Sequence, residues 1–123
     1  MYVVGQKFIP NDGDFRILVL GRRIALVIHR SRQDDTTHLN NTSKGGNARL
    51  IDLVDLPTHV QTNSLIATKA MGRGVAGVDM VQDLVTKNWY CFEVNAGPQI
   101  ATGAFLVEKQ KAFAQFVKTE LGK

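Results

Sequence analysis

The sequence contains few of the features that define specialised classes of protein. Its 123 residues include one cysteine, Cys91, and three prolines, and aromatic residues make up only 7%. A single cysteine excludes an internal disulfide, which favours a reducing compartment. No apolar run approaches the roughly 20 residues that cross a bilayer, and residues 1–5 (MYVVG) lack the basic and apolar regions of a signal peptide. We therefore expect a cytoplasmic protein with no membrane partner.

The remaining composition is that of one ordinary globular domain, spanning residues 1–123. Hydrophobic residues make up 44% and charged residues 21%, and the formal net charge is +4. Basic residues are densest in residues 16–32, where they alternate with apolar ones. No helix carries a basic stripe, and no strand offers the aromatic platform on which RNA bases stack. We expect no nucleic-acid partner and interpret the cluster as a site for a small anion, such as a nucleotide phosphate.

Apolar patterning predicts an α+β fold, in which an antiparallel sheet of two hairpins plus one strand packs against two helices. The expected elements are a strand at 2–9, hairpin strands at 15–20 and 24–29, a long loop at 31–49, a helix at 57–72, hairpin strands at 75–81 and 89–94, and a helix at 105–121. The side chains expected to face inward from the two helices are Val60, Leu65, Ile66, Ala70, Phe105, Phe113, Phe116 and Val117.

The second hairpin brings acidic residues together. A turn centred on Thr86 places Asp79 opposite Glu93, and Asn95 then points to the same face. Carboxylates that face each other across a sheet repel, and a divalent ion would remove that repulsion. The all-oxygen set of Asp79, Glu93 and Asn95 suits Mg²⁺ or Mn²⁺. The alternative is that the register slips by one residue, or that these are solvated acids at strand ends.

The first hairpin carries a second polar cluster. A turn centred on Arg22 places Asp14 opposite Arg30, and Arg16 then shares their face. A carboxylate can accept ribose hydroxyls, and guanidinium groups can hold phosphate oxygens in a bidentate fork. The alternative for this trio alone is a surface salt bridge.

The long loop at 31–49 ends in residues 41–46 (NTSKGG). Glycines allow a ligand to approach the backbone, and Lys44 adds a cation. The order differs from a Walker A sequence, in which the lysine follows the glycines. The alternative is a flexible glycine turn without a ligand.

These segments together resemble the C-terminal half of an ATP-grasp ligase. The branch they resemble contains glutamate ligases that modify ribosomal proteins, lysine-biosynthesis ligases and glutathione synthetases. The most specific elements are residues 74–79 (GVAGVD) and 92–98 (FEVNAGP). The resemblance implies that Asp79, Glu93 and Asn95 are the magnesium ligands.

Upstream segments are similar to the nucleotide-binding parts of the same family. The resemblance implies an interdomain hinge that contacts adenine, formed by Gln6, Lys7, Phe8 and Ile9. It places Asp14 on the ribose and Arg16 and Arg30 near the phosphates, as catalytic residues. Asn41 and Lys44 match the family's N-x-x-R-G-G element, with lysine in place of the usual arginine. Residue 7 also departs from the family, which usually has glutamate there.

The activity that the resemblance implies is ATP-dependent joining of a carboxylate to an amine, such as an amino acid or peptide, through an acylphosphate. The family clamps ATP between two subdomains, and we expect the first of these, with its glycine-rich lid, and the domain before it to be absent from this chain. We therefore expect the isolated chain to be inactive until that N-terminal half is supplied in cis or in trans. The alternative is a stand-alone, non-catalytic module that binds a nucleotide or a protein.

Overall fold

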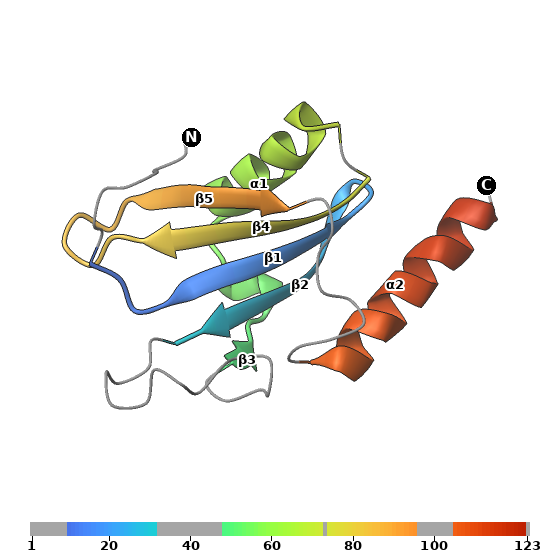
Figure 1. Ribbon diagram of the computed structural model, residues 1–123, viewed down its shortest axis with the longest axis horizontal. Coiled ribbons are helices and arrows are strands. Elements are labelled where there is room, and N and C mark those ends of the chain that lie inside the picture. The colour runs from blue at the N-terminus through green and yellow to red at the C-terminus, as the bar shows by residue number, and fades with distance from the viewer. Residues whose placement is uncertain (1–9, 32–47, 73, 96–104, 123) are drawn as a thin grey trace.

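The structure is a computed structural model that describes residues 10–31, 48–72, 74–95 and 105–122. Its elements are β1 (Asp14–Leu20), β2 (Arg23–Arg30), β3 (Ala48–Leu50), a 3₁₀ turn η3 (Leu53–Asp55), α1 (Thr58–Ala70), β4 (Val75–Gln82), β5 (Trp89–Asn95) and α2 (Leu106–Leu121), as Figure 1 shows. None of the described helices is long and apolar enough to cross a bilayer.

The five described strands form one antiparallel sheet in the order β3-β2-β1-β4-β5 (Figure 1). The α+β class and both hairpins are therefore confirmed. The strand expected at residues 2–9 lies outside the described residues and stays a prediction. The sheet has one further described strand, which was not expected. It is β3, which occupies the end of the segment expected to be a loop and pairs with the edge of β2.

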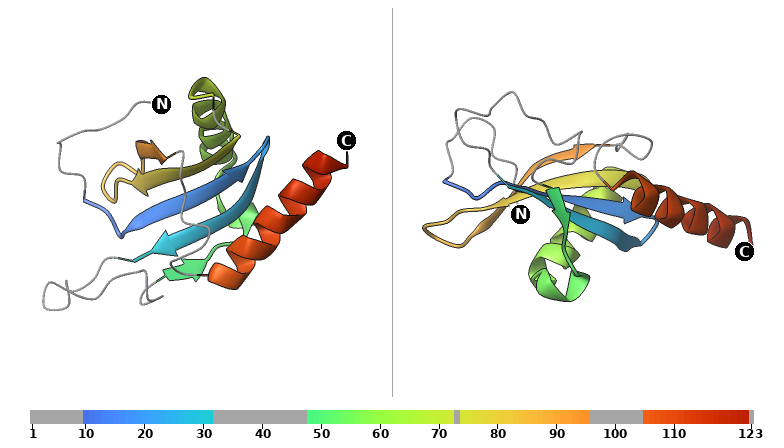
Figure 2. Two further views of the ribbon diagram at one scale, coloured as in Figure 1. Left: turned by 45° about the vertical axis from the view of Figure 1, so that its right-hand side comes forward. Right: turned by 90° about the horizontal axis from the view of Figure 1, so that it is seen from below.

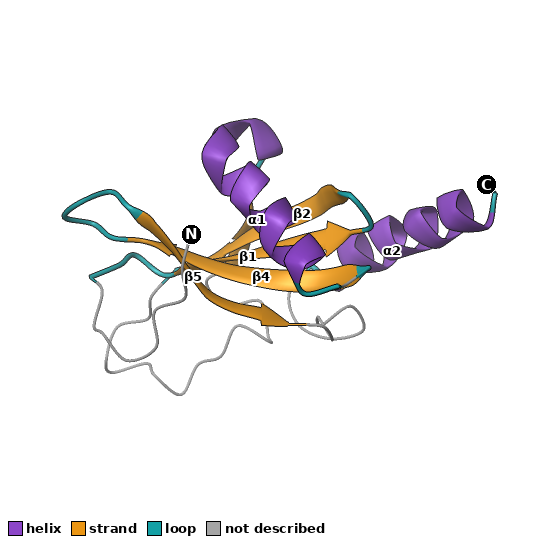
Figure 3. Cartoon of the chain, turned by 90° about the horizontal axis from the view of Figure 1, so that it is seen from above, coloured by secondary structure: helices purple, strands orange, loops and turns teal. Residues whose placement is uncertain are grey.

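The apolar core lies between the sheet and α1, which covers one face of the sheet (Figure 3). Side chains alternate between the two faces of a strand, so every second residue of β1 points toward α1. The buried core residues are Ile17, Val19, Val27, Leu56, Val60, Val78, Met80 and Cys91. We call the opposite side of the sheet the open face.

The buried side of α1 differs from the expected one. Ser64 and Thr68 are buried beside Val60, whereas Ile66 and Ala70 are exposed. The hydroxyls of Ser64 and Thr68 donate hydrogen bonds to the carbonyl oxygens four residues earlier, at 2.8 and 2.9 Å. Because these hydroxyls are satisfied within the helix, two small polar residues can pack closely against the sheet.

The second helix, α2, lies alongside the sheet, and its C-terminal end runs past the β1–β2 turn (Figure 2). The aromatic ring of Phe116 packs over Gly21 in that turn, where a β-carbon would lie 3.0 Å from the ring. The apolar residues expected to face inward, Phe113, Phe116 and Val117, are only half-buried, and Phe105 precedes the helix at a left-handed φ of 57°. The buried residue of this helix is Lys109.

Candidate functional site

Four charged side chains from three neighbouring strands meet on the open face. Asp14 and Arg16 extend from β1, Arg30 from β2 and Asp79 from β4. The register pairs Asp14 with Arg30 and Arg16 with Asp79. The expected register of the first hairpin is confirmed, and so is the shared face of Asp14, Arg16 and Arg30.

These residues form a continuous network that we call the charge ladder. The guanidinium of Arg30 donates to both carboxylate oxygens of Asp14, at 2.8 and 2.5 Å. Arg16 donates from Nε to Oδ1 and from Nη2 to Oδ2 of Asp79, the second at 3.1 Å. Arg30 also lies 3.5 Å from Asp79 Oδ1, which links the two bidentate pairs. Charges therefore alternate in sign in the order Asp14, Arg30, Asp79, Arg16.

The ladder is partly shielded from water, so its pairs are stronger than ordinary surface pairs. The side chains of Asp79 and Arg16 are 10% and 16% exposed. Burial opposes the charge of Arg30, but the hydrogen bonds and charge of Asp14, together with the charge of Asp79, outweigh it and raise the pKa of Arg30 above its ordinary value. The guanidinium group of Arg30 is therefore a fixed cation at the surface of the sheet.

Local backbone geometry places Asp14 at the start of β1. The preceding residue, Gly13, has a φ of 107° and passes so close to β2 that a β-carbon would lie 2.0 Å from the carbonyl oxygen of Arg30. Its N–H donates to the side-chain oxygen of Asn11 at 2.9 Å. Only glycine fits both this φ and this close approach, so residue 13 fixes where the ladder begins.

The expected metal ligands lie beside the ladder on β4 and β5. Asp79 pairs with Glu93, as predicted, and Asn95 pairs with Gly77 one step further along the same face. A bulge follows Asp79 in this pairing. Asp79 is buried, Glu93 is exposed and Asn95 is half-buried. Among the described residues no group of three or more His, Cys, Asp or Glu gathers as a metal cluster, so a site here depends on the amide of Asn95 as well as on two carboxylates.

Lys109 on α2 belongs to the same region and was not predicted. It is 6% exposed, and burial together with the charges of Arg16 and Arg30 lowers its pKa. Lysines are rarely buried, so sequence patterning assigns them to the solvent side of a helix. The only signal in the sequence is that Lys109 lies four residues before Phe113, which places it on the apolar side of α2.

Six of the expected binding residues lie outside the part of the chain that the structure describes, and their positions remain predictions. They are Gln6, Lys7, Phe8, Ile9, Asn41 and Lys44.

Two further titratable groups lie in the core and not on the open face. His29 is buried against the ring of Phe15, whose centroid lies 4.5 Å away, and burial and the charge of Arg49 lower the pKa of His29. Burial also raises the pKa of Cys91, which is free and lies in the core cluster. Burial thus favours the neutral form of both groups.

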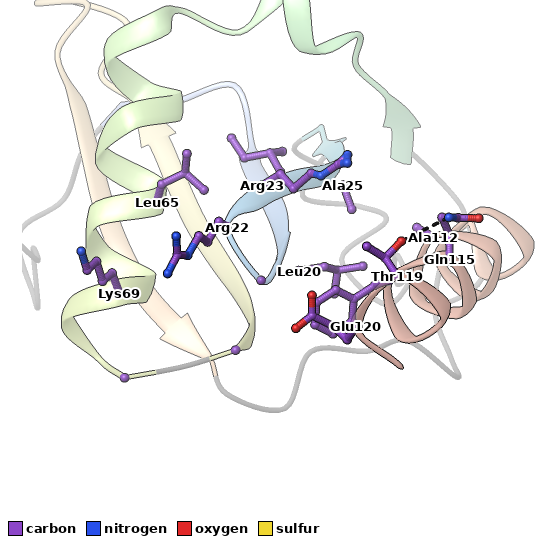
Figure 4. Close-up of a pocket in the computed structure, with 15 residues that line it drawn as sticks. Leu20, Arg22, Arg23, Ala25, Leu65, Lys69, Ala112, Gln115, Thr119 and Glu120 are labelled. Carbon is purple, nitrogen blue, oxygen red and sulfur yellow. Dashed lines mark hydrogen bonds between the residues drawn. The ribbon is translucent and has the colours of Figure 1, made fainter. Parts of the chain in front are cut away.

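A cleft of about 1120 Å³ opens at the other end of the sheet (Figure 4). Arg22 lines it from the β1–β2 turn, Lys69 from α1, and Phe116 and Glu120 from α2. This cleft is separate from the charge ladder, because β1 runs about 13 Å from the ladder to the turn.

The chain belongs to the RimK-like ATP-grasp domain family, whose model matches residues 1–112. Curated relatives include a probable alpha-L-glutamate ligase of Pasteurella multocida, 34% identical over 109 residues, which covers 87% of this chain and 32% of the relative. A second, from Pseudoalteromonas translucida, is 32% identical over 108 residues and covers 82% of this chain and 34% of the relative. The chain thus spans about a third of the length of these relatives.

Solved structures with the same fold are also ATP-grasp ligases. A Chryseobacterium gregarium RiPP-associated ATP-grasp ligase, in complex with ADP and a leader and core peptide, matches with a TM-score of 0.65 and 19% identity over 92% of this chain and 35% of that one. The ATP-grasp ligase PsnB, complexed with minimal precursor, Mg and ADP, matches with a TM-score of 0.62 and 17% identity over 90% of this chain and 35% of that one. At these identities the likeness establishes the fold.

Proposed function

We propose that this chain forms one wall of the nucleotide-binding site of an ATP-dependent carboxylate–amine ligase, and that this wall contacts ATP and a divalent metal ion. In the reaction, the γ-phosphoryl group of ATP passes to a carboxylate oxygen and ADP leaves. The amine nitrogen then attacks the acyl carbon, phosphate departs with the C–O bonding electrons, and the amine loses a proton to solvent. The observation that carries the proposal is the charge ladder, which lies on the open face directly beside the Asp79–Glu93 pair.

Arg16 and Arg30 can hold an anion while they remain in the ladder. A guanidinium has five N–H donors, and each bidentate pair uses two of them. The carboxylates of Asp79 and Asp14 therefore orient the two guanidinium groups and leave other N–H groups to donate to phosphate oxygens. Donors that are fixed before charge develops stabilise the transition state without reorganising.

Asp14 is in a position to accept a ribose hydroxyl. Its carboxylate is 29% exposed while it accepts hydrogen bonds from Arg30. Each carboxylate oxygen has two lone pairs, so a second donor can approach from solvent.

The donors of Asp79, Glu93 and Asn95 fit Mg²⁺ or Mn²⁺. Two carboxylates and an amide oxygen are hard ligands, and the lone pairs that Asp79 does not share with arginine remain available to a metal ion. Bound there, the ion would neutralise negative charge on the phosphates. The chain's own contribution is to hold these oxygens beside the two arginines.

By analogy with the relatives, we propose an amino acid or peptide as substrate, with the other wall supplied by the regions that the relatives possess outside the matched third. The isolated chain is then expected to release no ADP, because a nucleotide held by one wall keeps its phosphates in water.

A fusion tests this function, with residues 1–123 replacing the corresponding third of the Pasteurella multocida relative. The measurement is Mg²⁺-dependent ADP release with L-glutamate and a peptide acceptor, with the unmodified relative as positive control. We expect activity in the fusion, a loss of about 100-fold or more in Arg30→Ala, and no loss in the matched control Arg22→Ala, whose side chain is exposed in the turn. A folded fusion that forms no ADP while the unmodified relative does would contradict the proposal.

A further inference from the structure

The carboxylate of Asp79 is the point at which the charge ladder and the proposed metal site overlap. Arg16 donates hydrogen bonds to both of its oxygens, and Arg30 lies 3.5 Å from Oδ1. A carboxylate has about four lone-pair positions, so a metal ion can still approach Asp79 beside these donors. The arginines therefore leave the oxygens accessible but surround them with positive charge.

Guanidinium groups this close to Asp79 oppose the binding of a free divalent ion. Nη2 of Arg16 lies 3.1 Å from Oδ2 of Asp79. An ion bound to that oxygen at about 2.1 Å would lie no more than about 5 Å from Nη2. Because the side chains of Arg16 and Asp79 are only 16% and 10% exposed, water screens the repulsion less than it would at an open surface. The ladder thus lowers the affinity of Asp79 for an ion that arrives alone.

A metal ion that is already coordinated by phosphate meets the same residues differently. Its phosphate oxygens can accept hydrogen bonds from the N–H groups of Arg16 and Arg30 that the ladder does not use. The negative charge of the phosphate also offsets the repulsion between the ion and the two arginines. The same two side chains therefore oppose the free ion and attract its phosphate complex.

We propose that Arg16, assisted by Arg30, makes the metal site selective for a divalent ion that is already bound to phosphate over the free ion. The inference rests on the proposed function for the place of the metal ion and the phosphates. It gives Arg16 a role beyond contact with phosphate, because its pairing with Asp79 determines which form of the metal ion Asp79 and Glu93 accept.

The test compares Mn²⁺ alone with Mn²⁺ in an excess of pyrophosphate. Each is titrated into the 123-residue chain, and binding is measured by the broadening of the amide NMR signals of Asp79 and Glu93. In wild type we expect the pyrophosphate complex to bind about tenfold more tightly than the free ion. In Arg16→Gln we expect free Mn²⁺ to bind about tenfold more tightly than in wild type, and the complex to bind no more tightly, so that the preference for the complex is lost.

Further variants separate the charge near Asp79 from the net charge of the chain. Arg16→Lys keeps a positive charge beside Asp79 and should bind free Mn²⁺ within about threefold of wild type. The matched control is Arg22→Gln, which lowers the net charge equally in the exposed turn, about 13 Å from the ladder, and should bind free Mn²⁺ as wild type does. If Arg16→Gln does not fold, Arg30→Gln removes the more distant cation and should still tighten binding of the free ion by about threefold.

An arginine that only orients Asp79 would give the opposite result. In that case Arg16→Gln, or Arg30→Gln in its place, binds free Mn²⁺ no more tightly than wild type, and the inference is overturned. It is also overturned if Arg16→Gln and Arg22→Gln tighten binding equally, if wild type does not distinguish the free ion from its pyrophosphate complex, or if neither form broadens the signals of Asp79 and Glu93.

The Mn²⁺ measurements and the fusion assay can fail independently. Tighter binding of free Mn²⁺ by Arg16→Gln, in a chain whose fusion forms no ADP, would remove the ligase proposal and leave the role of Arg16 at the metal site. An active fusion together with unchanged binding of free Mn²⁺ in Arg16→Gln would remove only the selectivity assigned to Arg16.

Discussion

The two faces of one sheet are built in opposite ways from the same strands. Toward α1, alternate residues such as Ile17 and Val78 are completely buried in a core that contains Val60 of the helix. Toward the open face, the residues between them supply the charge ladder, whose members remain 10% to 29% exposed. A strand period of two lets one segment, β1, contribute to both.

The two faces therefore contribute differently to the free energy of folding. The face of the sheet that packs against α1 stabilises the fold by removing apolar surface from water, and this stabilisation needs no ligand. The open face keeps charges partly desolvated, which costs free energy unless each charge is paired. The ladder provides that pairing among its own members, so the open face can stay ordered before any ligand binds.

The largest expected loss of stability comes from creating a cavity in the core between the sheet and α1. Ile17→Ala removes a completely buried side chain, and we expect the free energy of unfolding to fall by about 3 kcal/mol. Chemical denaturation measures this loss. Ile66→Ala is the control, because Ile66 is 56% exposed on α1 and its loss should matter by less than about 1 kcal/mol. Equal losses of stability in both variants would show that Ile17 is not in the core.

The next effect comes from the backbone that positions the open face. Gly13→Ala would place a β-carbon 2.0 Å from the Arg30 carbonyl oxygen at an unfavourable φ. We expect a loss of about 2 to 3 kcal/mol, read from the denaturation midpoint. Gly72→Ala is the comparison, because Gly72 has a left-handed φ of 68° and no atom within 4 Å of the added β-carbon, so its loss reports a left-handed φ without a steric clash. Losses of the same size would mean that the close approach to Arg30 is absent.

A smaller effect is expected within the ladder. Asp79→Asn keeps the size of the side chain but removes the charge that pairs with Arg16 and Arg30, and we expect a loss of about 2 kcal/mol. Asp55→Asn, at an exposed carboxylate in η3, should change the free energy of unfolding by no more than about 0.5 kcal/mol. If the two variants have the same free energy of unfolding, the charge ladder does not stabilise the fold.

The smallest expected effect is a pH dependence of the free energy of unfolding that comes from buried His29. Burial and Arg49 lower the pKa of His29, and Asp12 and Asp14 only partly offset this. Below about pH 6.5 the unfolded chain binds a proton that folded His29 resists, so the free energy of unfolding falls as pH falls, by at most about 1.4 kcal/mol per pH unit. Denaturation between pH 7 and pH 5 should show this slope in wild type and in His59→Gln, which keeps His29, and a flatter profile in His29→Gln. An unchanged slope in His29→Gln would exclude His29 as the cause.

Sequence reasoning predicted the hairpins and their registers because alternation and short turns leave few ways to pair the strands. The placement of Asp14 opposite Arg30 and of Asp79 opposite Glu93 followed directly. It did not predict β3, because three residues are too few to show a periodic pattern. It misplaced the buried side of α1, since the hydroxyls of Ser64 and Thr68 are satisfied by the helix itself, which no hydropathy pattern reveals.

Strand pairing also explains which parts of the candidate site could be predicted from the sequence. Residues on paired strands were placed together, whereas Lys109 comes from a helix whose docking on the sheet depends on long-range packing. The pairing of Asp79 with two arginines was also missed, because each hairpin was considered alone. The contact between β1 and β4 joins the two hairpins and brings Arg16 to Asp79.

The central claim is that the open face binds a divalent ion beside the charge ladder, and Mn²⁺ titration of the chain followed by amide NMR tests it most directly. We predict that paramagnetic broadening affects Asp79 and Glu93 first, and that the double variant Asp79→Asn with Glu93→Gln loses this selectivity. Broadening spread evenly over exposed acids such as Asp52 and Asp55, with Asp79 and Glu93 affected no earlier, would contradict the claim.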